Sequence, residues 1–402
     1  MKIKSIHKEI KCNKAILRAE IESQHYPAAK RIFFSYPEKY ANYLPETADP
    51  FFPAVLIPAM LAGEDLEVIP PISGKLFSSQ LRIQEIFNLW NPGTTRLVKV
   101  NARELIETAA EKPERTATFF SLGVDSMYTM LKHLPANNPP EDRKLNTLIF
   151  IKGLELPLSI YSKGQDRELI KSINRLGRHY RLDVVTGETN IRDVFPVSYE
   201  KYYFGPCLAA TALSLSGGFR NILIPSSNSY SDLLPDPSSP LLDPLWSNET
   251  TTIIHDGSEK ERAEKIADTI AEEPYTLDRL RVCVDNQGGR SNCCRCWKCI
   301  RTMVTLDIVG KLERSSAFPL PLPGNYARQL RTYDPDSMVY ARENLKLARK
   351  YGRKDIEKKL YNEIRIGTLD ISREGKSISH LISELSCYFS VKLGRAMKIL
   401  DF

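Results

Sequence analysis

The sequence predicts an α/β protein whose central segment, residues 115–310, folds as a doubly wound parallel sheet. Short apolar runs alternate there with longer stretches of helical periodicity, which is the pattern of a parallel sheet. The first apolar run, Thr116–Phe120, is followed by a tight turn and the start of a helix. Ligands of such sheets bind beyond the carboxyl ends of the strands, so the loops at those ends are the first candidates for a site.

The predicted elements of the central segment follow one another along the chain. Each strand is a run of four to seven mostly apolar residues, and each helix repeats apolar residues at three and four. Strands are expected over 116–120, 145–151, 182–185 and 221–225, and helices over about 126–134, 166–180 and 207–216.

Two further regions flank this segment. Residues 1–112 are expected to form an α+β domain with no chemical motif, and residues 311–402 a basic helical region. The first region has short β-rich runs over 15–17 and 31–36 and an apolar run over 51–60. Strands are expected there over 66–69 and 96–100, and a helix over 79–90. The second has a Pro-rich connector, 315–325, before helices over about 336–349 and 354–365.

The composition is that of an ordinary globular protein. Of the 402 residues, 42% are hydrophobic and 26% charged, which excludes collagen-like and wholly disordered chains. No apolar run approaches the roughly 18–20 residues that cross a bilayer. The start, Met1–Ile6, lacks the apolar core of a signal peptide, so we expect a cytoplasmic protein with no membrane partner.

The net charge of +7 is concentrated at one end of the chain. Residues 311–402 contain 18 Lys and Arg against 11 Asp and Glu, whereas the first 310 residues are neutral. Such a tail is either a solvated helical face or the place where an anionic protein or nucleic acid would dock.

The turn after the first central strand carries the strongest chemical signal of this segment. Backbone N–H groups in a turn before a helix form an anion nest, and the helix dipole favours negative charge there. Hydroxyl groups of Ser121 and Ser126 add donors for a phosphate, and Asp125 suits a helix cap or a metal-linked acceptor. No Gly-Lys-Ser/Thr follows, so this is not a Walker A loop.

A second polar loop follows the 221–225 strand. Its hydroxyl and amide groups, Ser226, Ser227 and Asn228, suit the polar edge of a substrate. A long Pro/Ser-rich stretch then leads to Asp243, which we also expect to bind substrate, because long loops without regular structure are usually functional or mobile.

Five of the eight cysteines fall within 17 residues. Cys293, Cys296 and Cys299 are spaced by two residues, and Cys283 lies upstream in a strand-like run, 280–284. Four thiolates at such spacing favour a closed tetrahedral zinc site, with nearby Arg295, Lys298 and Arg301 offsetting its negative charge. An iron–sulfur cluster and no metal at all are the alternatives. Cys294 is the spare thiol, although it could replace Cys293.

The turn resembles the Ser-Gly-Gly-x-Asp-Ser signature of the PP-loop ATP pyrophosphatases, with Leu122 in place of a glycine. The resemblance implies that the loop binds ATP with Mg2+ while a substrate oxygen attacks the α-phosphate. It assigns Asp125 and Ser126 to catalysis. It assigns to ATP binding Ser121, Leu122, Gly123, Val124, Asp125 and Ser126, with Ile151, Lys152 and Gly153 at the end of the second strand beside adenine.

The loop and the cysteine cluster together resemble the 7-cyano-7-deazaguanine synthase family over about 115–305. That family usually has Cys-Gly-x-Cys-x-x-Cys, and here Cys294 takes the place of the glycine. Enlarged relatives occur in bacterial gene clusters, including anti-phage defence systems. The resemblance implies a ligase that adenylates a small-molecule carboxylate, such as a 7-deazaguanine carboxylate. An amine or ammonia then attacks to give an amide or nitrile, as in queuosine biosynthesis.

No histidine stands out as a general base in the sequence. His133, His179 and His255 are each expected to be structural, and the amine could lose its proton to solvent or to the leaving phosphate.

Two other functions are compatible with these features. One is a PP-loop tRNA-modifying enzyme, for thiolation or lysidine-type ligation, whose basic tail binds RNA with a steep salt dependence. The other is a catalytically silent, zinc-containing subunit that binds a nucleotide or a partner protein, Leu122 having disabled ATP hydrolysis.

Overall fold

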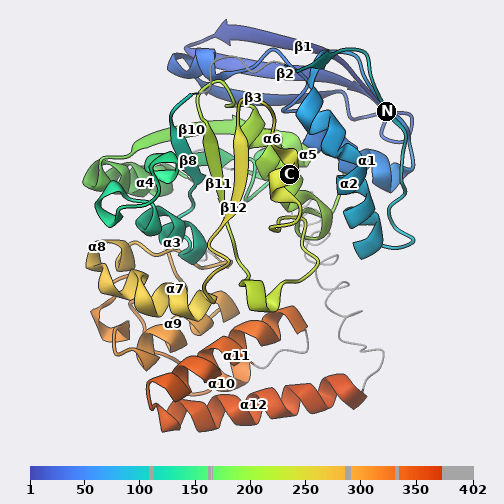
Figure 1. Ribbon diagram of the computed structural model, residues 1–402. Helices are drawn as coiled ribbons and strands as arrows, with labels where there is room; N and C mark the ends of the chain where they lie inside the picture. Colours follow the sequence, from blue (N-terminus) through green and yellow to red (C-terminus); the bar gives the residue numbers. More distant parts are fainter. Residues whose placement is uncertain (108–112, 162–163, 165, 286–290, 331–334, 374–402) are drawn as a thin grey trace, which may run out of the picture. The chain divides into compact units, whose positions relative to one another are not determined.

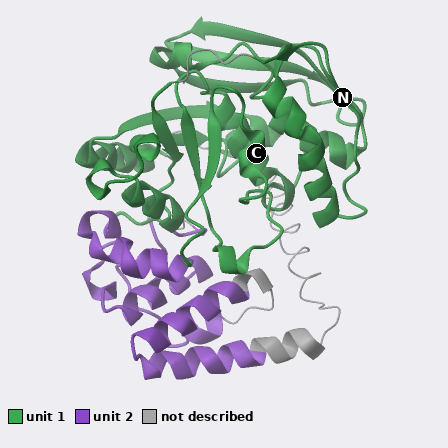
Figure 2. Cartoon of the chain, in the orientation of Figure 1, with its two compact units in different colours: residues 1–261, 279–281 green, residues 262–278, 282–402 purple. Residues whose placement is uncertain are grey.

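The computed structural model describes residues 1–402 except 108–112, 162–163, 165, 286–290, 331–334 and 374–402 (Figure 1). The chain forms two compact units (Figure 2). Unit 1 comprises residues 1–261 and 279–281, and unit 2 comprises residues 262–278 and 282–402. The chain therefore divides after residue 261, whereas the sequence places boundaries near 112 and 310.

Unit 1 contains a ten-stranded sheet in the order β12-β11-β8-β9-β10-β3-β2-β1-β4-β6. The five strands from β12 to β10 are all parallel to one another, and β10, β3, β2 and β1 pair antiparallel in that order. The strands are β1 Lys2–Lys11, β2 Lys14–Glu22, β3 Arg31–Pro37, β4 Leu66–Val68, β6 Val100–Ala102, β8 Thr116–Phe119, β9 Leu145–Lys152, β10 Asp183–Thr189, β11 Asn221–Pro225 and β12 Thr252–Asp256, with β5 Ile72–Ser73 and β7 Leu105–Ile106 in a small separate pair.

The parallel strands give the chain a topological switch point. From β8 the chain moves through β9 to β10 on one side and then returns to β11 and β12 on the other. Helices α3 and α4 pack on one face of these strands, and α6 lies on the other (Figure 1). The α/β class and the mostly parallel sheet predicted from the sequence are thus confirmed. The helices of unit 1 are α1 Phe52–Ala62, α2 Gly74–Trp90, α3 Val124–Lys132, α4 Arg167–Tyr180, α5 Ile191–Val194 and α6 Phe204–Leu213.

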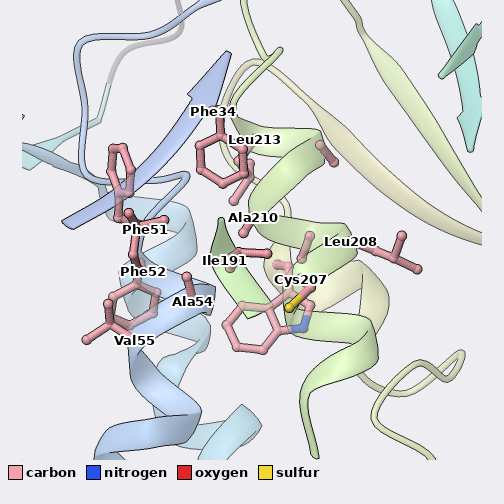
Figure 3. Packing of buried hydrophobic residues seen from close by; sticks show 14 of the residues in the cluster. Phe34, Phe51, Phe52, Ala54, Val55, Ile191, Cys207, Leu208, Ala210 and Leu213 are labelled. Carbon is pink, nitrogen blue, oxygen red and sulfur yellow. The ribbon is translucent and has the colours of Figure 1, made fainter. Parts of the chain in front are cut away.

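The core of unit 1 lies partly between α1 and α6 (Figure 3). Helix α1 is buried from Phe52 to Met60, and α6 offers it small side chains such as Ala210, together with Leu213. Small residues let the two helices approach closely, and the α1 aromatics fill the remaining space. The apolar run at 51–60 is therefore a helix with no polar face, which periodicity alone does not distinguish from a buried strand.

Several local expectations are wrong. The run 96–100 is mostly irregular, because the strand begins only at Val100, and the run 280–284 around Cys283 forms no strand. Strand β1 was not expected, because only Ile3 of its ten residues is buried and a register shift between Ile3 and Ser5 interrupts the alternation. Helix α2 begins earlier than its apolar pattern, since the Ser73 hydroxyl accepts the Leu76 amide at 3.0 Å as an N-cap.

Unit 2 is helical. Its core joins Ile300 and Val304 of α9 to Ala348 of α11 and Leu360 of α12. The predicted C-terminal helices are present as α11 and α12. The helices are α7 Arg262–Asp268, α8 Pro274–Leu277, α9 Trp297–Ile308, α10 Tyr326–Gln329, α11 Pro335–Lys350 and α12 Lys354–Arg373.

Candidate nucleotide site and candidate metal centre

The loop between β8 and α3 is the predicted phosphate loop, and Ser126 holds its shape. The Ser126 hydroxyl donates to the Gly123 carbonyl at 3.0 Å and accepts the Ser121 amide at 3.3 Å. Ser126 is buried, whereas Ser121 is exposed. The loop therefore presents the Ser121 side chain outward and uses Ser126 to fix the turn at the N-terminus of a nine-residue helix.

Leu122 takes up the conformation for which glycine is usually selected. Its φ is +64°, in the left-handed region that L-residues adopt at a cost. The side chain is only 3% exposed, so it packs inward and leaves the open side of the loop clear. Its carbonyl oxygen accepts the Arg281 amide at 2.9 Å, which holds the turn in place.

The loops after β8 and after β11 meet at the topological switch point. Ser227 donates to the Asp125 carboxylate at 3.5 Å, so the two predicted sets of site residues share a contact. Ser226 is buried, and its hydroxyl donates to the Asn228 carbonyl at 2.6 Å, which shapes the second loop. The crevice at such a switch point is where doubly wound sheets bind their ligands.

The end of β9 is shaped by close backbone approach. Gly153 has φ +96°, and a Cβ there would stand 1.9 Å from the Thr189 carbonyl oxygen, so only glycine fits. Ile151 is buried, and the Lys152 ammonium lies 3.6 Å from the Asp166 carboxylate. Burial raises the pKa of Asp166, and Lys152 opposes that rise.

A hollow of about 340 Å³, partly open to solvent, lies at the carboxyl end of β11. Its walls combine apolar side chains with hydroxyl, amide and imidazole groups, the usual mixture in such sites. The lining residues are Phe204, Pro225, Ser226, Ser227, Asn228, Leu233, Leu234, Asp236, Ser238, Ser239, Pro240 and His255.

Asp243, which the sequence predicts to bind substrate, faces His255. It is fully buried in a short 3-10 helix, Asp243–Trp246, and its Oδ2 lies 2.7 Å from His255 Nδ1 and 2.9 Å from the Ser238 hydroxyl that donates to it. Burial raises the pKa of Asp243, while the bonds from His255 and Ser238 lower it. Asp243 therefore orients His255, which lines the hollow.

A separate charged cluster ties α3 to the end of β12. The buried Asp256 carboxylate lies 2.9 Å from His133 Nε2 and 3.0 Å from Lys132 Nζ, and Thr129 donates to it at 2.9 Å. Burial alone would raise the pKa of Asp256, but the bonds from His133 and Lys132 outweigh it and hold the pKa below its usual range. His133 is thus a member of this buried charged cluster.

In unit 2, the four predicted zinc ligands lie together. The sulfur atoms of Cys283, Cys293, Cys296 and Cys299 all lie within 4.8 Å of one another. The Cys293–Cys299 and Cys283–Cys296 pairs are each 3.9 Å apart. A tetrahedral zinc with Zn–S bonds of about 2.3 Å separates its sulfurs by about 3.8 Å, so this group fits zinc closely.

Backbone amides complete the cysteine knuckle. The amides of Arg295 and Cys296 donate to Cys293 Sγ at 3.4 and 3.2 Å, which fixes the position of that sulfur. Cys294 lies outside the group of four, and its Sγ is 3.9 Å from the Asn292 carbonyl oxygen. Of these two adjacent cysteines, Cys293 is therefore the one whose sulfur belongs to the group. Like Leu122, Cys294 has a left-handed φ, +58°.

Of the basic residues expected near the sulfurs, Arg301 has the most defined surroundings. Its guanidinium lies 3.9 Å from the centre of the Tyr340 ring and 4.6 Å from that of Trp297, while Lys298 lies 5.4 Å over the Trp297 ring. These cation–π contacts fix α9 to α11 and keep positive charge on the helix that carries Cys299.

Sequence reasoning missed His255 as a site residue. Strand β12, which carries it, was not predicted, and Asp243 lies 12 positions before His255 with no periodic signal to link them. Only the fold brings the two side chains together.

Comparisons with protein-family models, curated proteins and solved structures found no match to this chain. None of the helices that the structure describes is long and apolar enough to cross a membrane.

Proposed function

We propose that this protein is an ATP-dependent ligase or synthase that adenylates a small-molecule carboxylate and joins it to an amine or ammonia. The observation that carries the proposal is the contact between Ser227 and Asp125, which joins the loop at the start of α3 to the rim of the hollow at the switch point. One site of this kind can hold a nucleotide phosphate on one side and a small acid on the other.

The chain's own groups suit the first step. The amides at the N-terminus of α3 and the exposed Ser121 hydroxyl would hold the phosphates, while Ser126 keeps the turn rigid. Asp125 is the carboxylate placed to hold Mg2+ bound with ATP. That ion would supply charge neutralisation at the phosphates. Gly153 and Lys152, at the end of the neighbouring strand, would lie beside the adenine.

Adenylation makes chemical sense for this reaction because a carboxylate oxygen is a poor leaving group and AMP is a good one. In the resembling synthase family the acid is a 7-deazaguanine carboxylate, and we propose that class as the substrate. The four cysteines of unit 2, whose sulfur separations suit zinc, would hold a structural zinc ion. The basic residues of 311–402 would take a protein or nucleic-acid partner.

Pyrophosphate release from ATP tests the proposal. Purified protein is assayed with Mg2+, ATP and a panel of carboxylic acids that includes 7-carboxy-7-deazaguanine, each with ammonium. Wild type and Glu46→Ala, an exposed carboxylate outside the site, should release pyrophosphate, and Asp125→Ala should not, with bound zinc unchanged. Asp125→Ala turnover at the wild-type rate contradicts the loop assignment.

Two other results would redirect the proposal. Release that requires tRNA and weakens steeply with salt indicates a tRNA-modifying enzyme. Tight nucleotide binding without any pyrophosphate release across the panel indicates a silent binding subunit.

A further inference from the structure

The hollow beside the phosphate loop is lined by His255, whose ring is held by a hydrogen bond to a buried carboxylate. His255 stands on β12, paired with Ile224 of β11, and its side chain is 5% exposed. Nδ1 lies 2.7 Å from the Asp243 carboxylate, and Nε2 has no protein partner among the described residues. Since the ring also lines the hollow, Nε2 is the nitrogen left for a ligand.

Further hydrogen bonds hold the Asp243–His255 pair in place. Asp243 accepts from the Ser238 hydroxyl as well as from His255, and its own amide donates to the Ser239 carbonyl at 2.9 Å. A carboxylate held this way keeps the imidazole proton on Nδ1 and leaves the Nε2 lone pair available. The arrangement is that of a proton acceptor and its orienting acid.

A second group in the hollow also points to a ligand. The Ser239 hydroxyl is buried and has no hydrogen-bond partner in the described part of the chain, although Ser239 is only 5% exposed and lines the hollow. A buried hydroxyl without a partner costs free energy, and a polar ligand would satisfy it. The apolar walls of Phe204, Leu233 and Pro240 would cover the faces of a flat ring.

We propose that His255, oriented by Asp243, is the general base of the second half-reaction and takes the proton from the attacking amine. This inference rests on the proposed function and adds the residue that the sequence did not supply. The amine nitrogen forms the C–N bond with the acyl carbon, and the C–O bond to AMP breaks with its electron pair leaving on the phosphate. His255 Nε2 takes the proton that the nitrogen loses, so atoms and charges balance.

The first half-reaction needs no such base, because a carboxylate attacks ATP in its ionised form. Loss of His255 should therefore separate the two steps. The acidic groups near the ring are Asp243, which faces Nδ1, and Asp236 in the wall of the hollow.

The experiment compares wild type with His255→Gln, Asp243→Asn and the control His179→Gln, an exposed histidine of α4. The probes are MgATP, 7-carboxy-7-deazaguanine and either ammonium or hydroxylamine, which is already unprotonated at pH 7. Acid-dependent ATP–pyrophosphate exchange should stay within about threefold of wild type in His255→Gln. Amide formation with ammonium should fall about 100-fold or more, with a smaller loss for hydroxylamine.

The pH profile adds a readout that a structural role would not change. The defect of His255→Gln should shrink as the pH rises and ammonia deprotonates by itself, and Asp243→Asn should show a smaller defect in the same direction. Nitrogen NMR of the free protein should place the proton of His255 on Nδ1 at pH 7.

Three results would overturn the inference. If His255→Gln forms the amide at the wild-type rate and keeps ATP–pyrophosphate exchange, only the assignment of His255 as the general base is contradicted. A proton on Nε2 of His255 in the free protein contradicts the proposed tautomer. Wild-type protein that releases no pyrophosphate with any acid contradicts the proposed function, and the inference falls with it.

Discussion

The backbone amide of Arg281 donates a hydrogen bond to the carbonyl oxygen of Leu122 at 2.9 Å. The same arginine forms two 3.0 Å bonds with Glu155, which follows β9. Arg281 thus joins the loops after two adjacent strands of unit 1 from a point 126 residues beyond Glu155. The candidate phosphate loop is therefore held by Arg281 as well as by Ser126 within the loop.

Leu122 predicts an unusual order of stability among substitutions. Leu122→Ala removes a buried side chain and keeps the backbone cost of positive φ, whereas Leu122→Gly removes both. We expect Leu122→Gly to lose about 1–2 kcal/mol of unfolding free energy and Leu122→Ala about 1 kcal/mol more. Urea unfolding of the two variants measures this, and an alanine variant more stable than the glycine variant would contradict the strained turn.

Asp256 predicts an acid-sensitive contribution to stability. Its folded pKa lies below the unfolded value of about 3.9, so its stabilisation is present above that pH and is lost as the pH falls. Asp256→Asn should cost about 3 kcal/mol at pH 7 and progressively less below pH 4. Unfolding curves from pH 3 to 7 test this, with exposed Glu141→Gln as the control. Equal losses at pH 3 and pH 7 would rule the charge out as the cause.

The cysteine group predicts about one zinc per chain. Cys296→Ser should abolish zinc binding and lower the melting temperature of unit 2, because a structural metal contributes folding free energy directly. Cys294→Gly should keep the metal, since Cys294 lies outside the group and glycine suits its positive φ. Metal analysis by mass spectrometry and thermal unfolding with a chelator are the measurements, and a brown, iron-containing preparation would contradict the zinc assignment.

Gly205 predicts a steric defect beside the hollow. A Cβ on this residue of α6 would stand 1.9 Å from the Pro237 carbonyl oxygen, and backbone cannot yield as a flexible side chain can. Gly205→Ala should therefore cost about 1–3 kcal/mol and displace the segment that carries Ser238 and Ser239. Gly324→Ala, where the added atom meets nothing within 4 Å, is the matched control. An unchanged unfolding midpoint in Gly205→Ala would contradict this packing.

The sequence predicted the parallel strands and the cysteine group well because both depend on local patterns. The buried strands are short apolar runs between helices, and Cys293, Cys296 and Cys299 lie within one knuckle. What was missed depends on contacts between distant residues. Helix α1 is buried on all sides, and β1 has an exposed polar face. The Asp243–His255 pair forms only when the segment before β12 folds back onto that strand.

The return of residues 279–281 to unit 1 has a consequence for synthesis on the ribosome. The Leu122 turn can gain its outside hydrogen bond only after Arg281 has left the exit tunnel, long after its own strand and helix have emerged. A fragment that ends at residue 261 would contain every strand of the sheet and still lack this bond. A truncated form of unit 1 that keeps this bond would need residues 279–281, joined by a designed linker or added as a separate peptide.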